Sequence, residues 1–462
     1  MSRDAKLIAL EQRPVGRLLA EYSLPAIIGM AAMSVYNIVD AIYIGQFCGA
    51  YAMAAMALVF PIMNLTIAFG TLIGLGSAAT ASIALGQQDF NRAFRVLGHC
   101  VMLGLIGGVI IGWLPLLWLE PILRLFGATD ATLQPAADFT LVLMLGFPLS
   151  SSFMNLNHLM RASGYPAKAM VSLLISMVVN IAAAHLFIYE LDWGMTGAGL
   201  ATVAAQFVGI LWVLHHFLQR GSVLHFCKGI YKLCGPITRR IMTVGLPPCL
   251  LNVAGCLVVV VFNQMLLSYE GEMGVGAFGI INRVVFLFVM IVLGITQGMQ
   301  PIAGYNLGLG NYRRVKRVLY CAMAAGTAVT LGGWLILQLC PHAVVSIFAR
   351  ETDADSARLI ALATEGVRLL TIAFPLVGSQ IVIGNFFQAI GRPAMSIFLN
   401  LSRQFLLLIP CLILLPPVLG SSGIWLAQGV ADTLSAALGF AVLYLFLTRV
   451  FRKHNHFTTE ND

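Results

Sequence analysis

Long apolar stretches separated by short polar segments run through the whole chain. Twelve of them reach about 20 residues, the length that a helix needs to cross the hydrocarbon core of a bilayer. The pattern therefore predicts an all-α integral membrane protein with 12 transmembrane helices, near residues 18–44, 52–80, 97–119, 136–158, 167–189, 196–218, 241–267, 276–302, 318–340, 359–385, 394–418 and 422–448.

Short motifs recur at a fixed spacing and divide the twelve helices into two halves. The pairs 222 residues apart are Ser23-Leu24-Pro25 with Gly245-Leu246-Pro247 and Leu85-Gly86 with Leu307-Gly308, and a pair 227 apart is Gly164-x-Pro166 with Gly391-x-Pro393. Six helices per half is an even number, so both halves enter the membrane from the same side. Two parallel six-helix repeats of this kind are common in secondary transporters.

The predicted organisation follows from this duplication. We expect an N-terminal lobe at 1–218, a basic linker at 219–236, a C-terminal lobe at 237–448 and a tail at 449–462. Pro25 and Pro247 interrupt the first helix of each lobe at equivalent positions, and such prolines either bend a helix permanently or act as hinges.

Composition agrees with a membrane location, and the charge distribution gives an orientation. Hydrophobic residues make up 59% of the chain and charged residues only 10%, whereas soluble domains carry about a quarter. With the N-terminus inside, 21 of the 27 Lys and Arg residues fall in inner segments, which predicts that both termini are cytoplasmic. The net charge of +8 is thus a topology signal, and we expect no nucleic-acid partner.

A few polar residues interrupt the apolar stretches and need a reason to be there. Asp40 follows 18 uncharged residues, and Asn180 and Thr202 lie about 12 Å below the outer boundary of the fifth and sixth helices. These oxygen-bearing groups can converge in the outer half of the first lobe, where sodium or a proton would suit them. His185, just beyond Asn180, is either a hydrogen-bonded packing residue or part of a proton relay.

The sequence of the second lobe predicts a buried ion pair. Arg403 and Asp432 each lie about ten residues into neighbouring antiparallel helices, at the level of the membrane midplane. They form either a structural clasp or a gating pair. Glu365 and Arg368, three residues apart, are expected to pair locally. Other polar residues are candidates for lining a cavity: Asn37, Asn157, Gln264, Arg283, Gln297 and Gln380.

No ATPase, hydrolase or metal-binding motif is present, so we expect an ion gradient to supply the energy and no cofactor or metal to be needed.

Several motifs together carry a resemblance to a known family. They are the stretches YNIVDAIYIGQ at 36–46 and QGMQPIAGYNLGLGNYRR at 297–314, together with the two prolines and the repeated G-x-P. In these motifs the chain resembles the MATE (multidrug and toxic compound extrusion) family, nearest its MepA-like bacterial branch. The resemblance covers essentially the whole chain.

This resemblance implies a multidrug antiporter of a bacterial inner membrane that exports cationic amphipathic compounds by alternating access, in exchange for protons or sodium. Asp40 matches the family's first-helix carboxylate, with Tyr36, Asn180 and Thr202 as its companions. Many members carry a second aspartate four residues after the asparagine. Ala184 occupies that position here, which favours protons over sodium.

Two other functions remain open at this point. A lipid-linked sugar flippase of the same superfamily would need a more cationic cavity, and a membrane-embedded enzyme would need a cluster of His or Asp near one interface. We expect no enzymatic activity. The expected partners are organic cations and membrane lipids, and nothing in the sequence demands a dimer.

Overall fold

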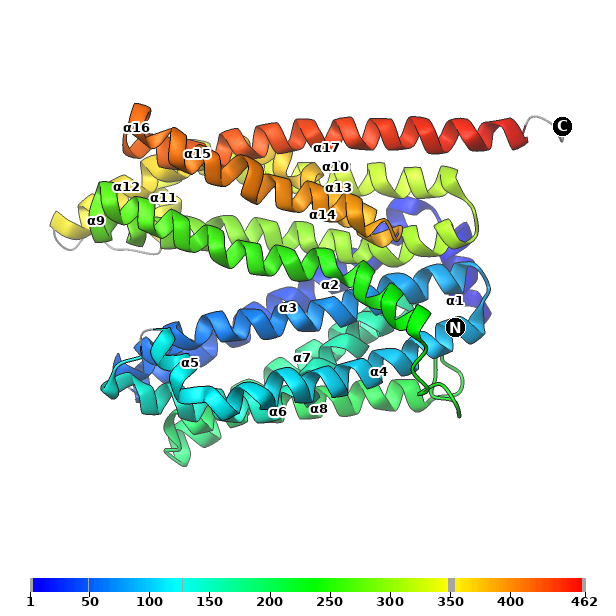
Figure 1. Ribbon diagram of the computed structural model, residues 1–462, viewed down its shortest axis with the longest axis horizontal. Coiled ribbons are helices and arrows are strands. Elements are labelled where there is room, and N and C mark those ends of the chain that lie inside the picture. The colour runs from blue at the N-terminus through cyan, green and yellow to red at the C-terminus, as the bar shows by residue number, and fades with distance from the viewer. Residues whose placement is uncertain (1–2, 49, 127, 348–353, 459–462) are drawn as a thin grey trace.

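A computed structural model describes residues 3–48, 50–126, 128–347 and 354–458. Helices account for nearly all of these residues, and no strand occurs among them. The helices run roughly side by side along the longest axis of the molecule (Figure 1). In a bilayer this arrangement is physically required, because helices satisfy their own backbone hydrogen bonds where water is absent.

The first half of the chain forms one bundle, here called the N-lobe. Its elements are α1 (Arg3–Gln12), α2 (Val15–Tyr43), η1 (Ile44–Cys48), α3 (Ala50–Gly86), α4 (Phe90–Trp113), η2 (Leu114–Trp118), α5 (Leu119–Leu125), α6 (Asp130–Ala162), α7 (Pro166–Ala184), η3 (His185–Glu190) and α8 (Gly194–Leu218).

The second half forms the C-lobe. Its elements are α9 (Gly235–Gly308), α10 (Tyr312–Leu339), α11 (Pro341–Val345), α12 (Ala354–Leu370), α13 (Phe374–Ala389), α14 (Pro393–Leu401), η4 (Ser402–Leu408), α15 (Ile409–Leu414), α16 (Pro416–Leu419) and α17 (Ser421–Thr458).

The predicted count of twelve spans agrees with this structure once two irregular helices are taken into account. Ten described helices are long and apolar enough to cross a membrane, and a pair bent by 58°, Ala357–Leu370 and Phe374–Ala389, makes one more span. The 74-residue α9 is two helices joined at Gly271, whose φ of 68° and ψ of −158° reverse the chain. Glycine tolerates that conformation because it has no Cβ. The all-α, twelve-helix prediction is confirmed.

The apolar core shows how the two lobes are joined. One cluster of buried side chains contains residues of both lobes, among them Leu10 and Leu85 of the N-lobe and Tyr305 and Val318 of the C-lobe. Two further clusters lie within single lobes, one around Ile44 in the N-lobe and one around Trp425 in the C-lobe. The lobes therefore share a core at one end of the molecule and separate at the other.

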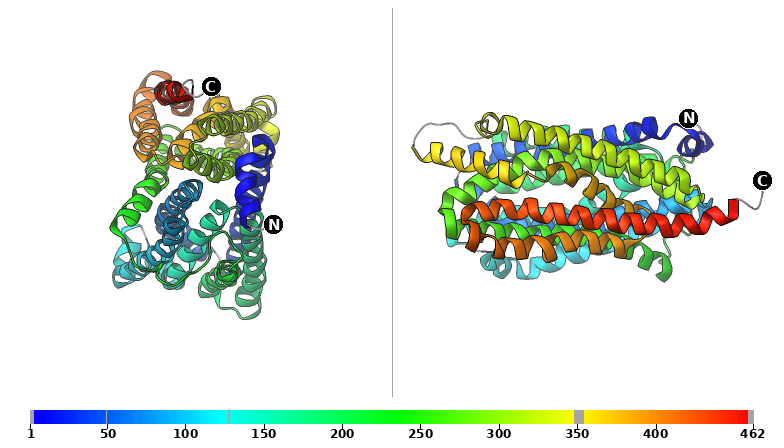
Figure 2. Two further views of the ribbon diagram at one scale, coloured as in Figure 1. Left: turned by 90° about the vertical axis from the view of Figure 1, so that its right-hand side faces the viewer. Right: turned by 90° about the horizontal axis from the view of Figure 1, so that it is seen from above.

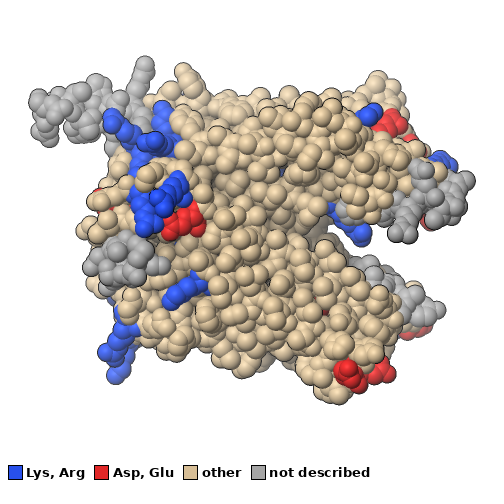
Figure 3. Space-filling model, turned by 180° about the vertical axis from the view of Figure 1, so that it is seen from behind, with Lys and Arg blue, Asp and Glu red and all other residues tan. Residues whose placement is uncertain are grey.

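The space-filling view shows the result as a cleft between the lobes (Figure 3). The cleft opens at the end opposite α1 and the C-terminal end of α17, which both lie at the closed end. Seen from that closed end, the C-lobe lies above the N-lobe (Figure 2, left). Most of the Lys and Arg side chains visible on the face in Figure 3 lie at the closed end.

Close approach of helices at the closed end depends on glycine. A Cβ added to Gly76, Gly86, Gly245 or Gly308 would overlap a backbone carbonyl oxygen of the opposite lobe, namely that of Ile241, Tyr305, Leu72 or Ile83 respectively. We call these four residues the glycine seam. Small residues permit such contacts between membrane helices.

The described part of the predicted C-terminal tail is helical. Helix α17 continues past its candidate membrane span, Ser421–Arg449, to Thr458. The linker, by contrast, lies between the end of α8 at Leu218 and the start of α9 at Gly235.

Candidate functional site

The structure brings Asp40 of α2 together with Asn180 of α7 and Thr202 of α8. The Asp40 Oδ2 atom accepts hydrogen bonds from Thr202 Oγ1 at 3.4 Å and from Asn180 Nδ2 at 3.5 Å. All three side chains are buried, with Asp40 only 7% exposed. We call this group the Asp40 site.

Two oxygen atoms of the Asp40 site lack a partner among the described residues. They are Asp40 Oδ1 and Asn180 Oδ1, both buried. No ion pair to Asp40 occurs in the described part of the chain either. A buried carboxylate with an unused oxygen and no counter-charge is costly, and a bound cation or proton would relieve that cost.

The neighbourhood of the Asp40 site contributes little further charge. Ala184 is fully buried one helical turn beyond Asn180, at the position where a carboxylate would have faced the same site. Tyr36 is half-buried one turn before Asp40 on α2. The side chain of Asn37, a predicted cavity residue, lies outside the described residues.

Both helices that carry the site change their winding directly beyond it. Helix α2 passes into the π-helix η1 after Tyr43, and α7 passes into the π-helix η3 at His185. The Tyr43 hydroxyl lies 3.3 Å from His185 Nδ1, and His185 Nε2 lies 3.6 Å from Glu190 Oε1. Sequence reasoning singled out His185 but missed Tyr43 and Glu190, because π-helical winding has no clear signal in local sequence.

In the C-lobe, Arg403 and Asp432 form the expected ion pair. Arg403 Nη1 lies 3.2 Å from Asp432 Oδ1, and the Asp432 side chain is 6% exposed. Gln428 Nε2 donates to Asp432 Oδ2 at 3.0 Å. Gln428 was missed, although its place one turn before Asp432 could have indicated it. Arg403 belongs to another π-helix, η4.

The remaining cavity candidates lie in different environments. Asn157 is buried inside the N-lobe, where it donates to Ala169 O and Ser172 Oγ. Gln380 donates to Ser435 Oγ within the C-lobe, and Gln297 reaches Met30 Sδ across the lobe boundary. Gln264 and Arg283 are exposed on α9. The structure therefore does not bring the candidate set together into one site.

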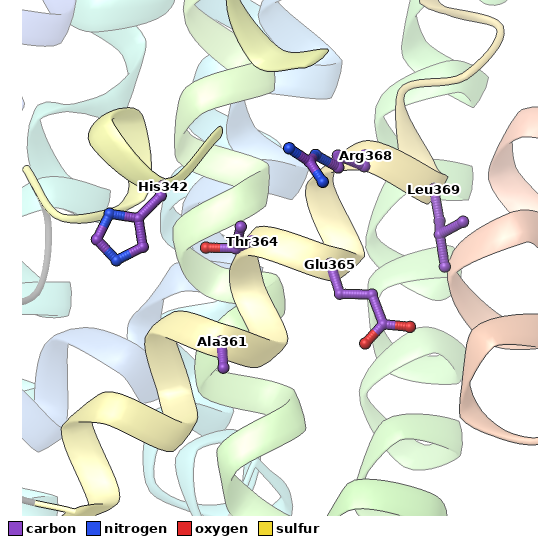
Figure 4. A pocket seen from close by; sticks show the side chains of 6 residues that line it. All are labelled: His342, Ala361, Thr364, Glu365, Arg368 and Leu369. Carbon is purple, nitrogen blue, oxygen red and sulfur yellow. The ribbon is translucent and has the colours of Figure 1, made fainter. Parts of the chain in front are cut away.

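The expected local pair of Glu365 and Arg368 is wrong. Their side chains point in different directions on α12, as Figure 4 shows, and line a depression of about 390 Å³ with His342 and Thr364. Glu365 accepts instead from Ser422 Oγ at 3.4 Å. A spacing of three residues permits a contact, but the hydroxyl partner of Glu365, Ser422, lies on the neighbouring helix α17.

Comparison with known proteins identifies the family. The MatE family model matches residues 25–186 and 247–414, so its two copies begin at Pro25 and Pro247. The chain belongs to the MatE family. In this family of multidrug efflux transporters, the similar proteins include Multidrug export protein MepA of Staphylococcus saprophyticus subsp. saprophyticus, 25% identical across 97% of this chain and 98% of that protein. MepA of Staphylococcus aureus strain MSSA476 is 23% identical over the same share of each.

Solved structures of MATE proteins share the fold. The MATE multidrug transporter DinF-BH is 33% identical, with a TM-score of 0.85 over 95% of this chain and 96% of that one. A MOP superfamily transporter from Pyrococcus furiosus gives a TM-score of 0.90 at 23% identity, over 96% and 98% of the two chains. This chain is accordingly a multi-pass MATE transporter.

Proposed function

We propose that this MATE transporter is an ion-coupled antiporter that exports cationic amphipathic compounds. The observation that carries the proposal is the Asp40 site, a buried carboxylate with an unused oxygen and no cationic partner among the described residues. An uncompensated buried charge creates a strong preference for binding a proton, a sodium ion or a cationic compound. Competition for one carboxylate is a direct way to couple ion entry to drug exit.

The composition of the site favours the proton over sodium. Sodium is a hard cation that prefers several oxygen ligands, and the Asp40 site offers one carboxylate, one amide and one hydroxyl. Ala184 leaves the site without a second negative charge. A proton needs only one oxygen, and Asp40 Oδ1 has no hydrogen-bond partner among the described residues.

The arrangement of the lobes supports a cycle of alternating access. With the basic closed end and the termini placed in the cytoplasm of a bacterial cell, the cleft faces outward. Pro25 and Pro247 lie beside the lobe boundary, since Ser23 Oγ donates to Ile295 O and Gly245 belongs to the glycine seam. A proton on Asp40 would shift the balance between the outward-open and inward-open states only if it binds one of these states more tightly than the other.

The test is accumulation of ethidium in cells that express the protein or the variant Asp40→Asn at equal levels. The variant keeps the size and hydrogen bonding of the side chain but removes its charge. We expect the unmodified protein to lower ethidium accumulation and the variant to behave like cells without the protein. Glu365→Asn, at another carboxylate with a hydroxyl partner, is the control and should export normally.

Reconstituted vesicles then identify the ion. We expect an imposed pH gradient to drive ethidium movement in the absence of sodium. Equal export by Asp40→Asn would place coupling elsewhere, with the Arg403–Asp432 pair as the next candidate. Failure of both proteins to export any cation would favour the flippase alternative, in which Arg403 would hold an anionic headgroup.

A further inference from the structure

A chain of polar side chains leads from the outer surface of the N-lobe toward the Asp40 site. Glu190 and His185 have side chains that are 56% and 52% exposed. The His185 ring contacts both Glu190, through Nε2 at 3.6 Å, and Tyr43, through Nδ1 at 3.3 Å. Both ring nitrogens are therefore engaged, one toward the surface and one toward α2.

Aromatic contacts hold the His185 ring in this position. Tyr189 stacks on it with ring centroids 5.1 Å apart and an angle of 23° between the planes. Tyr43 meets it edge-on at 6.2 Å. The titratable groups facing His185 are thus Tyr43 on α2 and Tyr189 and Glu190 on η3. Asp192 lies farther along the chain and lines a depression of about 380 Å³ with Cys48 of η1.

The position of this chain relative to Asp40 follows from helix geometry. Tyr43 is three residues beyond Asp40 on α2, and His185 is five residues beyond Asn180 on α7. At 1.5 Å per residue these offsets are about 5 Å and 8 Å along the helix axes. The contact between Tyr43 and His185 therefore lies farther toward the outer surface than the contact between Asp40 and Asn180, by about 5–8 Å along the helix axes.

We propose that His185 relays protons between the outer solution and Asp40. A proton arrives at Nε2 from Glu190 or from water, and Nδ1 gives up its own proton to the Tyr43 hydroxyl oxygen. Tyr43 releases its original hydroxyl proton through water to Asp40 Oδ1. One N–H bond forms as another breaks, so the ring ends neutral. Outer water then resets the half-exposed ring by donating a proton to Nδ1 and accepting the one on Nε2, so the proton on Asp40 is not returned. Imidazole suits this task because its two nitrogens exchange donor and acceptor roles.

This inference rests on the proposed proton coupling, and its test separates the two. Purified protein is reconstituted into vesicles, and proton movement driven by an ethidium gradient is followed with a pH-sensitive dye. His185→Gln retains a hydrogen-bonding side chain but cannot carry a proton. We expect its initial rate to fall about 100-fold or more, within the range of lost proton-transfer catalysis. Ethidium affinity at constant pH is expected to stay unchanged.

Chemical rescue distinguishes a relay from a structural role. Soluble imidazole added on the Glu190 side should restore much of the rate in His185→Gln, because it replaces the missing proton carrier. His342→Gln, at the outer end of the C-lobe, is the matched control and should behave like the unmodified protein. Tyr43→Phe, which keeps the ring but loses the hydroxyl, should also slow proton movement.

Two results would overturn the relay. One is an unchanged rate in His185→Gln; the other is a lower rate accompanied by weaker ethidium binding and no response to imidazole. A different outcome concerns the proposed function alone: if the unmodified protein moves ethidium with a sodium gradient and ignores a pH gradient, proton coupling fails and the relay fails with it. That outcome is read from the unmodified protein, before any variant is compared.

Discussion

At the scale of single residues, position 184 allows a test of the proposed preference for protons. Ala184 is fully buried and lies on the same face of α7 as Asn180. We expect Ala184→Asp to add a second carboxylate to the Asp40 site and to make ethidium export dependent on sodium. The measurement is export from vesicles with a sodium gradient at equal pH on both sides. Ala184→Asn has similar size without charge and should gain no sodium dependence; the same response in both variants would contradict the prediction.

The Arg403–Asp432 pair gives a second prediction at this scale. Removing one member leaves the other charge buried, which costs about 3–5 kcal/mol. We expect Arg403→Met to lower the thermal stability of the purified protein and the double variant Arg403→Met/Asp432→Leu to recover most of it. Ethidium export by the double variant then assigns the role of the pair. Normal export indicates a structural clasp, and lost export from a stable protein indicates a gate.

At the scale of helices, the sequence predicts the regular parts well and the irregular parts poorly. Hydropathy places all twelve spans because crossing a bilayer imposes length and apolarity directly. The break at Gly271, the bend before Phe374 and the three described π-helices depend on contacts with neighbouring helices, which local sequence does not encode. Asp40, Asn180 and Thr202 could be grouped from their depth alone, whereas Tyr43 and Glu190 could not.

The glycine seam supports a prediction about a single helix contact. A methyl group on Gly245 would overlap the Leu72 carbonyl oxygen, so Gly245→Ala should push α9 away from α3 at the closed end. Spin labels at the exposed, repeat-related positions Asn91 and Arg313 should report a longer distance between the lobes. Gly255→Ala is the control on the same helix, because no described atom outside its own stretch of helix lies within 4 Å of the added carbon. An unchanged distance in Gly245→Ala would show that the seam does not determine lobe separation.

At the scale of the whole molecule, the lobes are held together at the closed end by backbone contacts as well as by apolar packing. Arg314 of α10 donates through Nε to Leu10 O at 3.2 Å and through Nη2 to Arg13 O, and Asn306 Nδ2 donates to Leu10 O at 3.2 Å. These donors belong to the C-lobe, and the carbonyl groups lie at the end of α1 in the N-lobe. In the alternating-access cycle proposed above, this contact would have to break before the closed end could open.

We therefore expect Arg314→Ala to favour the state in which the closed end opens. Hydrogen bonds to a charged donor contribute about 1.5–3 kcal/mol each. Losing them is enough to shift an evenly populated equilibrium between the closed and open states of this end strongly. The same spin labels at Asn91 and Arg313 would measure the shift as a larger population of long distances. Arg317→Ala, one turn farther along α10, is the control. A distance distribution that does not change would mean that the apolar cluster alone holds the lobes together.

The pairing within the glycine seam also bears on how such a chain could have arisen. Gly86 approaches Tyr305 and Gly308, while Gly308 approaches Ile83 and Gly86, so equivalent residues of the two repeats contact each other reciprocally. Reciprocal contact of equivalent residues is the property of a two-fold homodimer interface. Because both repeats have the same orientation, an ancestral six-helix protein could pair with its own copy in one orientation in the membrane. Joining the two genes end to end would then require only the linker, after which each half was free to specialise: Asp40 in one, Arg403 and Asp432 in the other.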